Sequence, residues 1–249
     1  MIAVKHITKV FHRGQIDEVT ALRDVSLEIK EGEFIVVVGA NGSGKTTFLN
    51  VLQGGCLPDK GSVSINGKEI TWLPEHQRSQ WISRIFQNPL HGTAPDLSIR
   101  DNFRLAALRA GKKQLRIGND RNFEKEIRER IAELDMQLEN KLDQPMGSLS
   151  GGQRQALTLL MAIMDRTDIL LMDEPTAALD PKSAKMVMSL AERFNRERGI
   201  TILYITHQLK DALQYGNRLL QFSAGKIIRD LDAQAKKSLS LQELYGWFE

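Results

Sequence analysis

The sequence lacks the features of a disulfide-stabilised or membrane-spanning protein. It has one cysteine, Cys56, among 249 residues, so an intrachain disulfide framework is excluded and a reducing compartment is indicated. No apolar run approaches the ~20 residues that a membrane helix needs. The first residues carry no apolar core of signal-peptide length. We therefore expect any membrane role to come through a partner.

The sequence also lacks a large excess of basic or acidic residues. Lys and Arg number 34 against 31 acidic residues, which gives a net charge of +3. Nucleic-acid binding usually requires a concentrated basic face, so we expect no nucleic-acid partner. A short basic cluster at residues 109–118 could contact lipid headgroups or an acidic partner, but a solvated surface loop is the simpler interpretation. Chain length and a hydrophobic share of 41% fit one large domain or a domain with an inserted lobe.

The sequence is organised around a strand, a glycine-spaced loop and a helix. Residues 34–38 read Phe-Ile-Val-Val-Val, which is typical of a buried strand, and residues 47–52 favour a helix. Between them, residues 39–46 match the phosphate-loop pattern G-x-x-x-x-G-K-[ST] in its required context. This agreement predicts a nucleotide phosphate site rather than an ordinary glycine-rich turn with a surface lysine.

The residue types in this loop suit phosphate chemistry. Glycines allow the backbone N–H groups to form an anion-binding nest, and the following helix directs its positive end at the same anion. Lys45 is expected to reach the β- and γ-phosphates, and the Thr46 hydroxyl is placed to ligate Mg²⁺. The residues predicted to bind the phosphates are Gly39, Ala40, Asn41, Gly42, Ser43, Gly44, Lys45, Thr46 and Thr47.

Two further apolar runs deliver polar side chains at their ends. Residues 169–172 precede Asp173, which fits an acid that holds Mg²⁺ through its water shell, and Glu174, which could orient or deprotonate an attacking water. A predicted strand at residues 200–206 ends at His207. Ligands of α/β proteins bind at the carboxyl ends of parallel strands, so these three side chains are candidate site residues.

A second glycine-rich segment lies just before the helix predicted at residues 156–163. Ser150, Gly151 and Gly152 precede this helix and form either another phosphate nest or only a helix cap. Upstream, a predicted strand at residues 82–86 ends at Gln87, which begins a loop. Apolar periodicity then predicts helices at residues 99–109 and 122–138.

Phe11 is an aromatic residue at the end of the first predicted strand. An aromatic ring beside a nucleotide site can stack on adenine. Without further information, the sequence favours an ordinary packing role for this phenylalanine.

Taken together, these motifs closely resemble the ATP-binding cassette subunits of ABC transporters over essentially the full length. The phosphate loop, Gln87, residues 149–153, the Asp173-Glu174 pair, residues 178–180 and His207 occur in the order of that family. The resemblance implies an α/β fold of the P-loop NTPase type, with a mixed β-sheet, flanking helices and an N-terminal antiparallel β subdomain. It also implies one cassette of 1–249, in which residues 1–87 and 166–249 form the ATP-binding core and residues 88–165 an inserted helical lobe.

The resemblance also assigns roles and partners. It implies ATP and Mg²⁺ as cofactors, Phe11 as the adenine-stacking residue, and His207 as a contact of the γ-phosphate. Gln87 is implied to sense Mg²⁺ or water and to relay this to a membrane partner. ATP on one copy would be closed by a second copy, most simply in a homodimer, through the residues Ser150, Gly151, Gly152 and Gln153.

Residues 73–76, 86–95 and 153–162 look like a narrower bacterial subgroup that serves importers with extracytoplasmic substrate-binding proteins, some linked to aromatic amino acids. We therefore expect an ATP-hydrolysing subunit that drives import through separate permease subunits at the cytoplasmic face of the cell membrane. The alternative is a soluble cassette ATPase of the iron–sulfur assembly type. A nucleotide switch without turnover is disfavoured by the presence of both Glu174 and His207.

Overall fold

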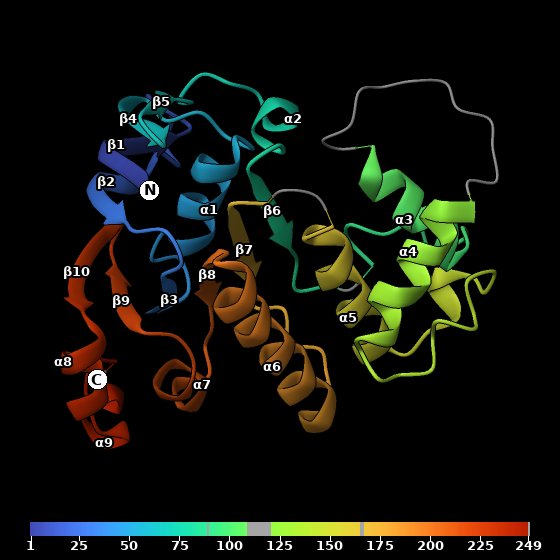
Figure 1. Cartoon of the computed structure of the whole chain (residues 1–249). Helices are drawn as coiled ribbons and strands as arrows, with labels where there is room; N and C mark the ends of the chain where they lie inside the picture. Colours follow the sequence, from blue (N-terminus) through green and yellow to red (C-terminus); the bar gives the residue numbers. More distant parts are fainter. Residues whose placement is uncertain (89, 109–120, 165–166, 249) are drawn as a thin grey trace.

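The computed structural model describes residues 1–88, 90–108, 121–164 and 167–248, and within them a mixed sheet forms the centre (Figure 1). Its strand order is β10-β9-β3-β8-β7-β6, and all neighbours are parallel except the edge pair β9 and β10. The parallel arrangement brings the carboxyl ends of β3, β7 and β8 to one edge. The bounds are β3 (Phe34–Gly39), β6 (Ile82–Ile85), β7 (Ile169–Asp173), β8 (Thr201–Ile205), β9 (Arg218–Ser223) and β10 (Lys226–Leu231).

A separate antiparallel sheet is built mainly from the N-terminal part of the chain. Its order is β2-β1-β4-β5. The strands are β1 (Ile2–Phe11), β2 (Val19–Ile29), β4 (Lys60–Ile65) and β5 (Lys68–Glu69). The mixed sheet and this antiparallel sheet confirm the fold class expected from the sequence.

Helices and the loops that join them make up the described segments between β6 and β7, which lie to the right of the sheets in Figure 1. These are α3 (Ile99–Ala107), α4 (Arg121–Ala132), the 3₁₀ helix η1 (Met146–Ser148) and α5 (Gly151–Ala162). The exact limits of the lobe, residues 88–165, stay a prediction, and its basic cluster at 109–118 lies outside the described residues. The remaining helices are α1 (Lys45–Gln53), α2 (Glu75–Arg78), α6 (Pro181–Arg198), α7 (Leu209–Gln214), α8 (Ala233–Ser238) and α9 (Leu241–Tyr245).

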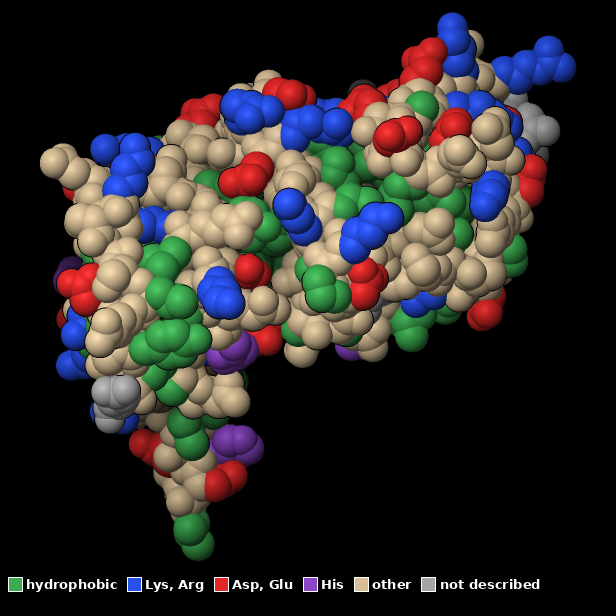
Figure 2. Space-filling model, turned by 90° about the horizontal axis from the view of Figure 1, so that it is seen from below, with side chains coloured by type: hydrophobic (Ala, Val, Ile, Leu, Met, Phe, Trp, Pro, Cys, Tyr) green, Lys and Arg blue, Asp and Glu red, His purple; other side chains and the backbone are tan. Residues whose placement is uncertain are grey.

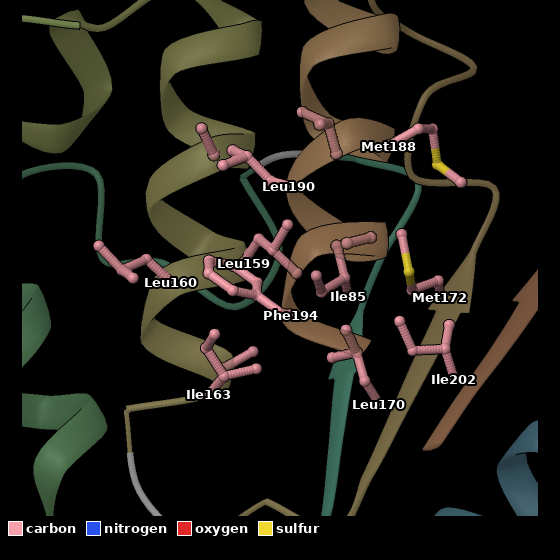
Figure 3. Close-up of a cluster of buried hydrophobic side chains, with 14 of the residues drawn as sticks. Ile85, Leu159, Leu160, Ile163, Leu170, Met172, Met188, Leu190, Phe194 and Ile202 are labelled. Carbon is pink, nitrogen blue, oxygen red and sulfur yellow. The ribbon is translucent and has the colours of Figure 1, made fainter. Parts of the chain in front are cut away.

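Alternate side chains of the central strands supply two hydrophobic cores. On β7, Leu170 and Met172 pack in one core with side chains of α5 and α6, whereas Leu171 packs in the other core with side chains of α1 and the antiparallel sheet. Figure 3 shows the first core, where Leu159 and Phe194 approach the sheet from the two helices. Because both faces of the sheet are buried at its centre, β3, β7 and β8 are almost continuously apolar along their length.

One helix is shorter than the periodicity predicted. The expected helix at 122–138 ends at Ala132, because Asp135 and Gln137 take left-handed backbone conformations with φ of +54° and +57°. Leu134 and Leu138 are nevertheless buried, so their apolar spacing reflects packing beyond the helix end. Among the described residues, no helix combines the length and hydropathy needed to cross a bilayer.

Candidate nucleotide site

The loop between β3 and α1 is confined so closely that two of its glycines cannot be replaced. Gly39 has φ of +157°, and a Cβ added to it would lie 2.4 Å from the carbonyl oxygen of Phe222. Gly44 has φ of +106°, and its added Cβ would lie 2.5 Å from the carbonyl oxygen of Ala21. The loop therefore holds its backbone in a fixed curve between β2 and β9, and α1 begins directly after it at Lys45.

Lys45 folds back over this loop. Its Nζ donates to the carbonyl oxygens of Gly39 at 2.8 Å and Ala40 at 3.0 Å. Burial lowers the pKa of Lys45, while the nearby carboxylates of Glu174 and Asp173 oppose that shift. The ammonium group is thus held at the loop in a partly desolvated position, where a phosphate would be an effective counter-ion.

Ser43 provides an independent sign that the loop fits a polar ligand. Its side chain is buried, and among the described residues its Oγ has no hydrogen-bond partner. Buried hydroxyl groups in proteins are normally paired. Around it, Ala40, Asn41, Gly42 and Thr46 are exposed, and Thr47 is half-buried. The loop therefore presents polar and backbone groups on an open side.

A cleft of about 530 Å³ continues from this open side. Its lining includes the phosphate-loop residues Gly39, Ala40 and Asn41, His207 with its neighbours at 206 and 208–210, and the C-terminal residues Tyr245 and Phe248. The cleft thus joins the loop after β3 to the end of β8, as expected for a ligand site in an α/β sheet.

Glu174 and His207 contact each other directly. Glu174 follows β7, His207 follows β8, and their Oε1 and Nε2 atoms lie 2.7 Å apart. Glu174 has φ of +50°, a conformation that is uncommon outside glycine and is often found at functional sites. The sequence placed both residues near the γ-phosphate but did not predict their contact.

Asp173 has a partner that the sequence analysis missed. Arg84 of β6 donates from Nη2 to Asp173 Oδ2 at 2.6 Å. The available signal was an arginine inside the predicted strand at residues 82–86, between Ile82 and Ile85. Gln87 lies two residues beyond the end of β6 and is exposed, and no described hydrogen bond links its side chain to Asp173 or to Thr46.

The segment Ser150 to Gln153 lies at the N-terminus of α5. Ser150 Oγ accepts from the Gln153 backbone N–H, and Gln153 Oε1 accepts from the backbone N–H of Ser150, so this segment caps α5; phosphate binding by it stays a prediction. Ser150 and Gly151 are exposed, whereas an added Cβ on Gly152 would meet Ser183 Oγ at 2.3 Å. Among the described residues, no hydrogen bond or ion pair joins this segment to the phosphate loop of the same chain.

Phe11 lies at the end of β1 and pairs with Val19 of β2. Two residues further along β2, Ala21 contacts the phosphate loop at Gly44. This register brings the half-buried Phe11 ring to the antiparallel-sheet side of the loop, with Lys9 Nζ 5.3 Å from its centroid. Its stacking on adenine stays a prediction.

Comparison with known proteins assigns the family. The family model described as ABC transporter matches residues 22–177, more than half of the chain. The chain belongs to the ABC transporter family. It is an ATP-binding subunit with the ATPase activity that these cassettes share, as its sequence predicted.

Two bacterial relatives extend this likeness over most or all of the chain. A tyrosine transport ATP-binding protein of Clostridioides difficile is 36% identical and covers 100% of this chain and 99% of its own length. A lipoprotein-releasing system ATP-binding protein, LolD 1 of Caulobacter vibrioides, is 34% identical, with 88% of this chain and 91% of that protein covered. None of these findings supports the iron–sulfur assembly alternative.

Solved ABC cassettes have the same fold. The dimeric structure of the bacterial ABC transporter cassette MJ0796 matches with a TM-score of 0.79 and 29% identity over 94% of this chain and 99% of that one. A post-hydrolysis dimer of the same cassette, bound to ADP and Pi, matches with a TM-score of 0.79 and 28% identity over the same shares.

Proposed function

We propose that this subunit dimerises around two MgATP and drives solute import through separate membrane subunits. The proposed solute is an amino acid and, more specifically, an aromatic amino acid. The observation that carries the import proposal is the full-length similarity to a tyrosine transport ATP-binding protein. The subunit would lie peripherally at the cytoplasmic face of the cell membrane, and an extracytoplasmic binding protein would deliver the solute to the permease.

The exposure of the α5 N-terminus supports a head-to-tail dimer. Ser150 and Gly151 face solvent, although they form a helix start suited to an anion. The phosphate loop also has an open side, at Asn41 and Thr46. In a two-fold dimer, the N-terminus of each α5 would cover the ATP bound to the other copy. The same surface of both copies would therefore be buried in two equivalent sites. The dimeric solved cassette is consistent with this arrangement.

The residues around the loop also fit a magnesium ion. The Thr46 hydroxyl, the Asp173 carboxylate and the Gln87 amide are hard oxygen donors, and Asp173 ends β7 near Lys45. When bound, Mg²⁺ would neutralise charge on the phosphate oxygens. Asp173 would hold the ion through its water shell, and Gln87 would respond to its presence.

The remaining side chains have separable tasks in hydrolysis. Lys45 would bind the β- and γ-phosphates, exchanging its carbonyl partners for anionic ones. Glu174 would accept a proton from the attacking water, and His207, which contacts that carboxylate, would hold it in place and face the γ-phosphate.

A groove beside Gln87 is suited to a permease segment. A cavity of about 520 Å³ lies between β6 and the lobe and is lined by Phe86 and Leu105 among others. Leu90, Leu97 and Leu105 expose 41–51% of their surface on this part of the chain. Such exposed apolar side chains are typical of an interaction surface. We expect the permease to contact Gln87 and the segment at residues 89–97 that follows it, of which Pro89 lies outside the described residues.

The charge distribution on the surface shown in Figure 2 does not indicate a nucleic-acid partner. Figure 2 shows basic and acidic side chains interspersed over the face seen from below, with hydrophobic side chains gathered among them. A continuous basic stripe is absent from the described residues on this face. This pattern is consistent with protein partners for the subunit.

Replacement of Phe11 by Ala should weaken ATP binding by about 1–3 kcal/mol, the usual contribution of an aromatic ring stacked on a base. Phe11→Tyr should retain the affinity because it keeps the ring. Titration with a fluorescent ATP analogue measures the effect, and Trp72→Ala, which removes an exposed aromatic side chain elsewhere, is the control. Unchanged affinity in Phe11→Ala would leave Phe11 with a packing role only.

The transporter proposal is tested by isolating tagged Glu174→Gln protein from detergent-solubilised membranes with ATP present. Loss of the base should hold the ATP-bound assembly together, so mass spectrometry should recover a multi-helix permease. The permease would then lead to the solute. Recovery of soluble partners alone, with no protein in the membrane fraction, would refute the transporter proposal and favour an assembly ATPase.

A further inference from the structure

Arg84 connects three parts of the nucleotide site from within the central sheet. Its side chain is 7% exposed and lies on β6, next to the strand that ends in Asp173. Nη2 donates to Asp173 Oδ2, and Nη1 donates to Asn50 Oδ1 at 2.5 Å and Gln53 Oε1 at 3.0 Å on α1. The guanidinium carbon also lies 5.0 Å from the ring centroid of Phe86, the residue before Gln87.

This set of contacts fixes the orientation of the Asp173 carboxylate. A planar guanidinium presents its donors in a rigid fork, so anchoring Nη1 on α1 leaves Nη2 aimed at Oδ2. Oδ1 has no hydrogen-bond partner among the described residues, and it remains available on the other side of the carboxylate. Arg84 also provides a positive charge beside Asp173, and a second acid, Glu174, follows Asp173 directly in the chain.

We propose that Arg84 is a positioning residue that holds Asp173 Oδ2 so that Oδ1 is directed to the magnesium water shell. The inference rests on the proposed MgATP site. Arg84 touches neither nucleotide nor metal in this role. It acts through Asp173, and its anchors on α1 keep that carboxylate in register with the helix that follows the phosphate loop.

A role through charge alone predicts a change in Mg²⁺ affinity of the opposite sign. If Arg84 only neutralised Asp173, removing it would make the site more negative and would strengthen Mg²⁺ binding. If Arg84 orients Asp173, removing it should weaken Mg²⁺ binding by about tenfold, the lower end of the effect seen when a partner of a metal ligand is lost. The sign of the change therefore separates the two roles.

The test compares Arg84→Met and Arg84→Lys with the parent protein. Affinity for a fluorescent ATP analogue is measured in EDTA and across a Mg²⁺ series, and the Mg²⁺ concentration that gives half of the magnesium-dependent change is recorded. We expect unchanged affinity in EDTA, a midpoint about tenfold higher in Arg84→Met, and partial recovery in Arg84→Lys. Lysine keeps the charge, but its single ammonium lacks the fork.

Arg218→Met is the matched control. Arg218 lies on β9 of the same sheet and donates from Nη2 to Asp230 Oδ2 at 2.7 Å, away from the phosphate loop. It should leave the magnesium midpoint unchanged. In an Asp173→Asn background, Arg84→Met should produce no further shift, because the carboxylate on which it acts is gone.

Two results would overturn the proposal: a midpoint in Arg84→Met that equals or falls below that of the parent, or the same upward shift in Arg218→Met. If Arg84→Met does not fold, Arg84→Lys carries the same test, and an unshifted midpoint there also overturns the role. Failure of the parent protein to bind the analogue, or to respond to Mg²⁺, would instead refute the proposed MgATP site.

Discussion

Glu174→Gln is expected to lower ATP hydrolysis on the order of 10²–10⁴-fold, because it removes the proposed general base. Glutamine has nearly the same shape as glutamate, so the backbone at the end of β7 and the contact with His207, 2.7 Å away, should persist. Nucleotide binding depends on the loop and Lys45, which the change does not touch. We therefore expect the variant to bind ATP and to accumulate as an ATP-bound dimer.

Phosphate release and size-exclusion chromatography with ATP measure these two outcomes. Glu197→Gln is the matched control, since Glu197 is an exposed glutamate near the end of α6, away from the nucleotide cleft. It should keep parental turnover and should not stabilise the dimer. A Glu174→Gln protein that hydrolyses ATP as fast as its parent would show that another group, or water itself, takes the proton.

The phosphate loop could be predicted in detail because its determinants are local. Successive residues specify the strand, the turn and the helix start, and the two confined glycines, Gly39 and Gly44, belong to the pattern itself. The same holds for the cap at Ser150, where Ser150 and Gln153, three positions apart, accept each other's backbone hydrogen bonds. Motif order then identified the family, which the comparisons confirm.

The side-chain contacts across strands could not be predicted in this way. Glu174 meets His207 because β7 and β8 pair with Asp173 opposite Ile205. This register cannot be predicted from the sequence of either strand alone. Arg84 meets Asp173 for a similar reason, since β6 pairs with β7. Long-range pairing decides which polar side chains meet at the edge of the sheet. It also explains why Leu138 is buried beyond the actual end of α4: the lobe core, rather than helical periodicity, holds it.

Ser150→Phe should abolish cooperative hydrolysis while leaving ATP binding intact. Ser150 is exposed in the single chain, so a phenylalanine side chain displaces no internal packing. In the proposed dimer it would project into the ATP held by the other copy and separate the α5 N-terminus from the phosphates. Since the loss of one preorganised donor already costs about 10²–10³ in rate, exclusion of the whole helix start should lower turnover at least on the order of 10².

The substitution also removes a helix cap, which typically costs ~1 kcal/mol of stability. Ser240→Phe controls for this cost, because Ser240 forms the same capping box at the start of α9. Both variants should melt at similarly lowered temperatures, but only Ser150→Phe should lose hydrolysis and the ATP-dependent dimer. Mixing Ser150→Phe with Lys45→Ala subunits adds a further check: one of the two sites in a mixed dimer then combines an intact loop with an intact Ser150, so some activity should return. Full-rate hydrolysis by monomeric Ser150→Phe protein would contradict the two-copy site.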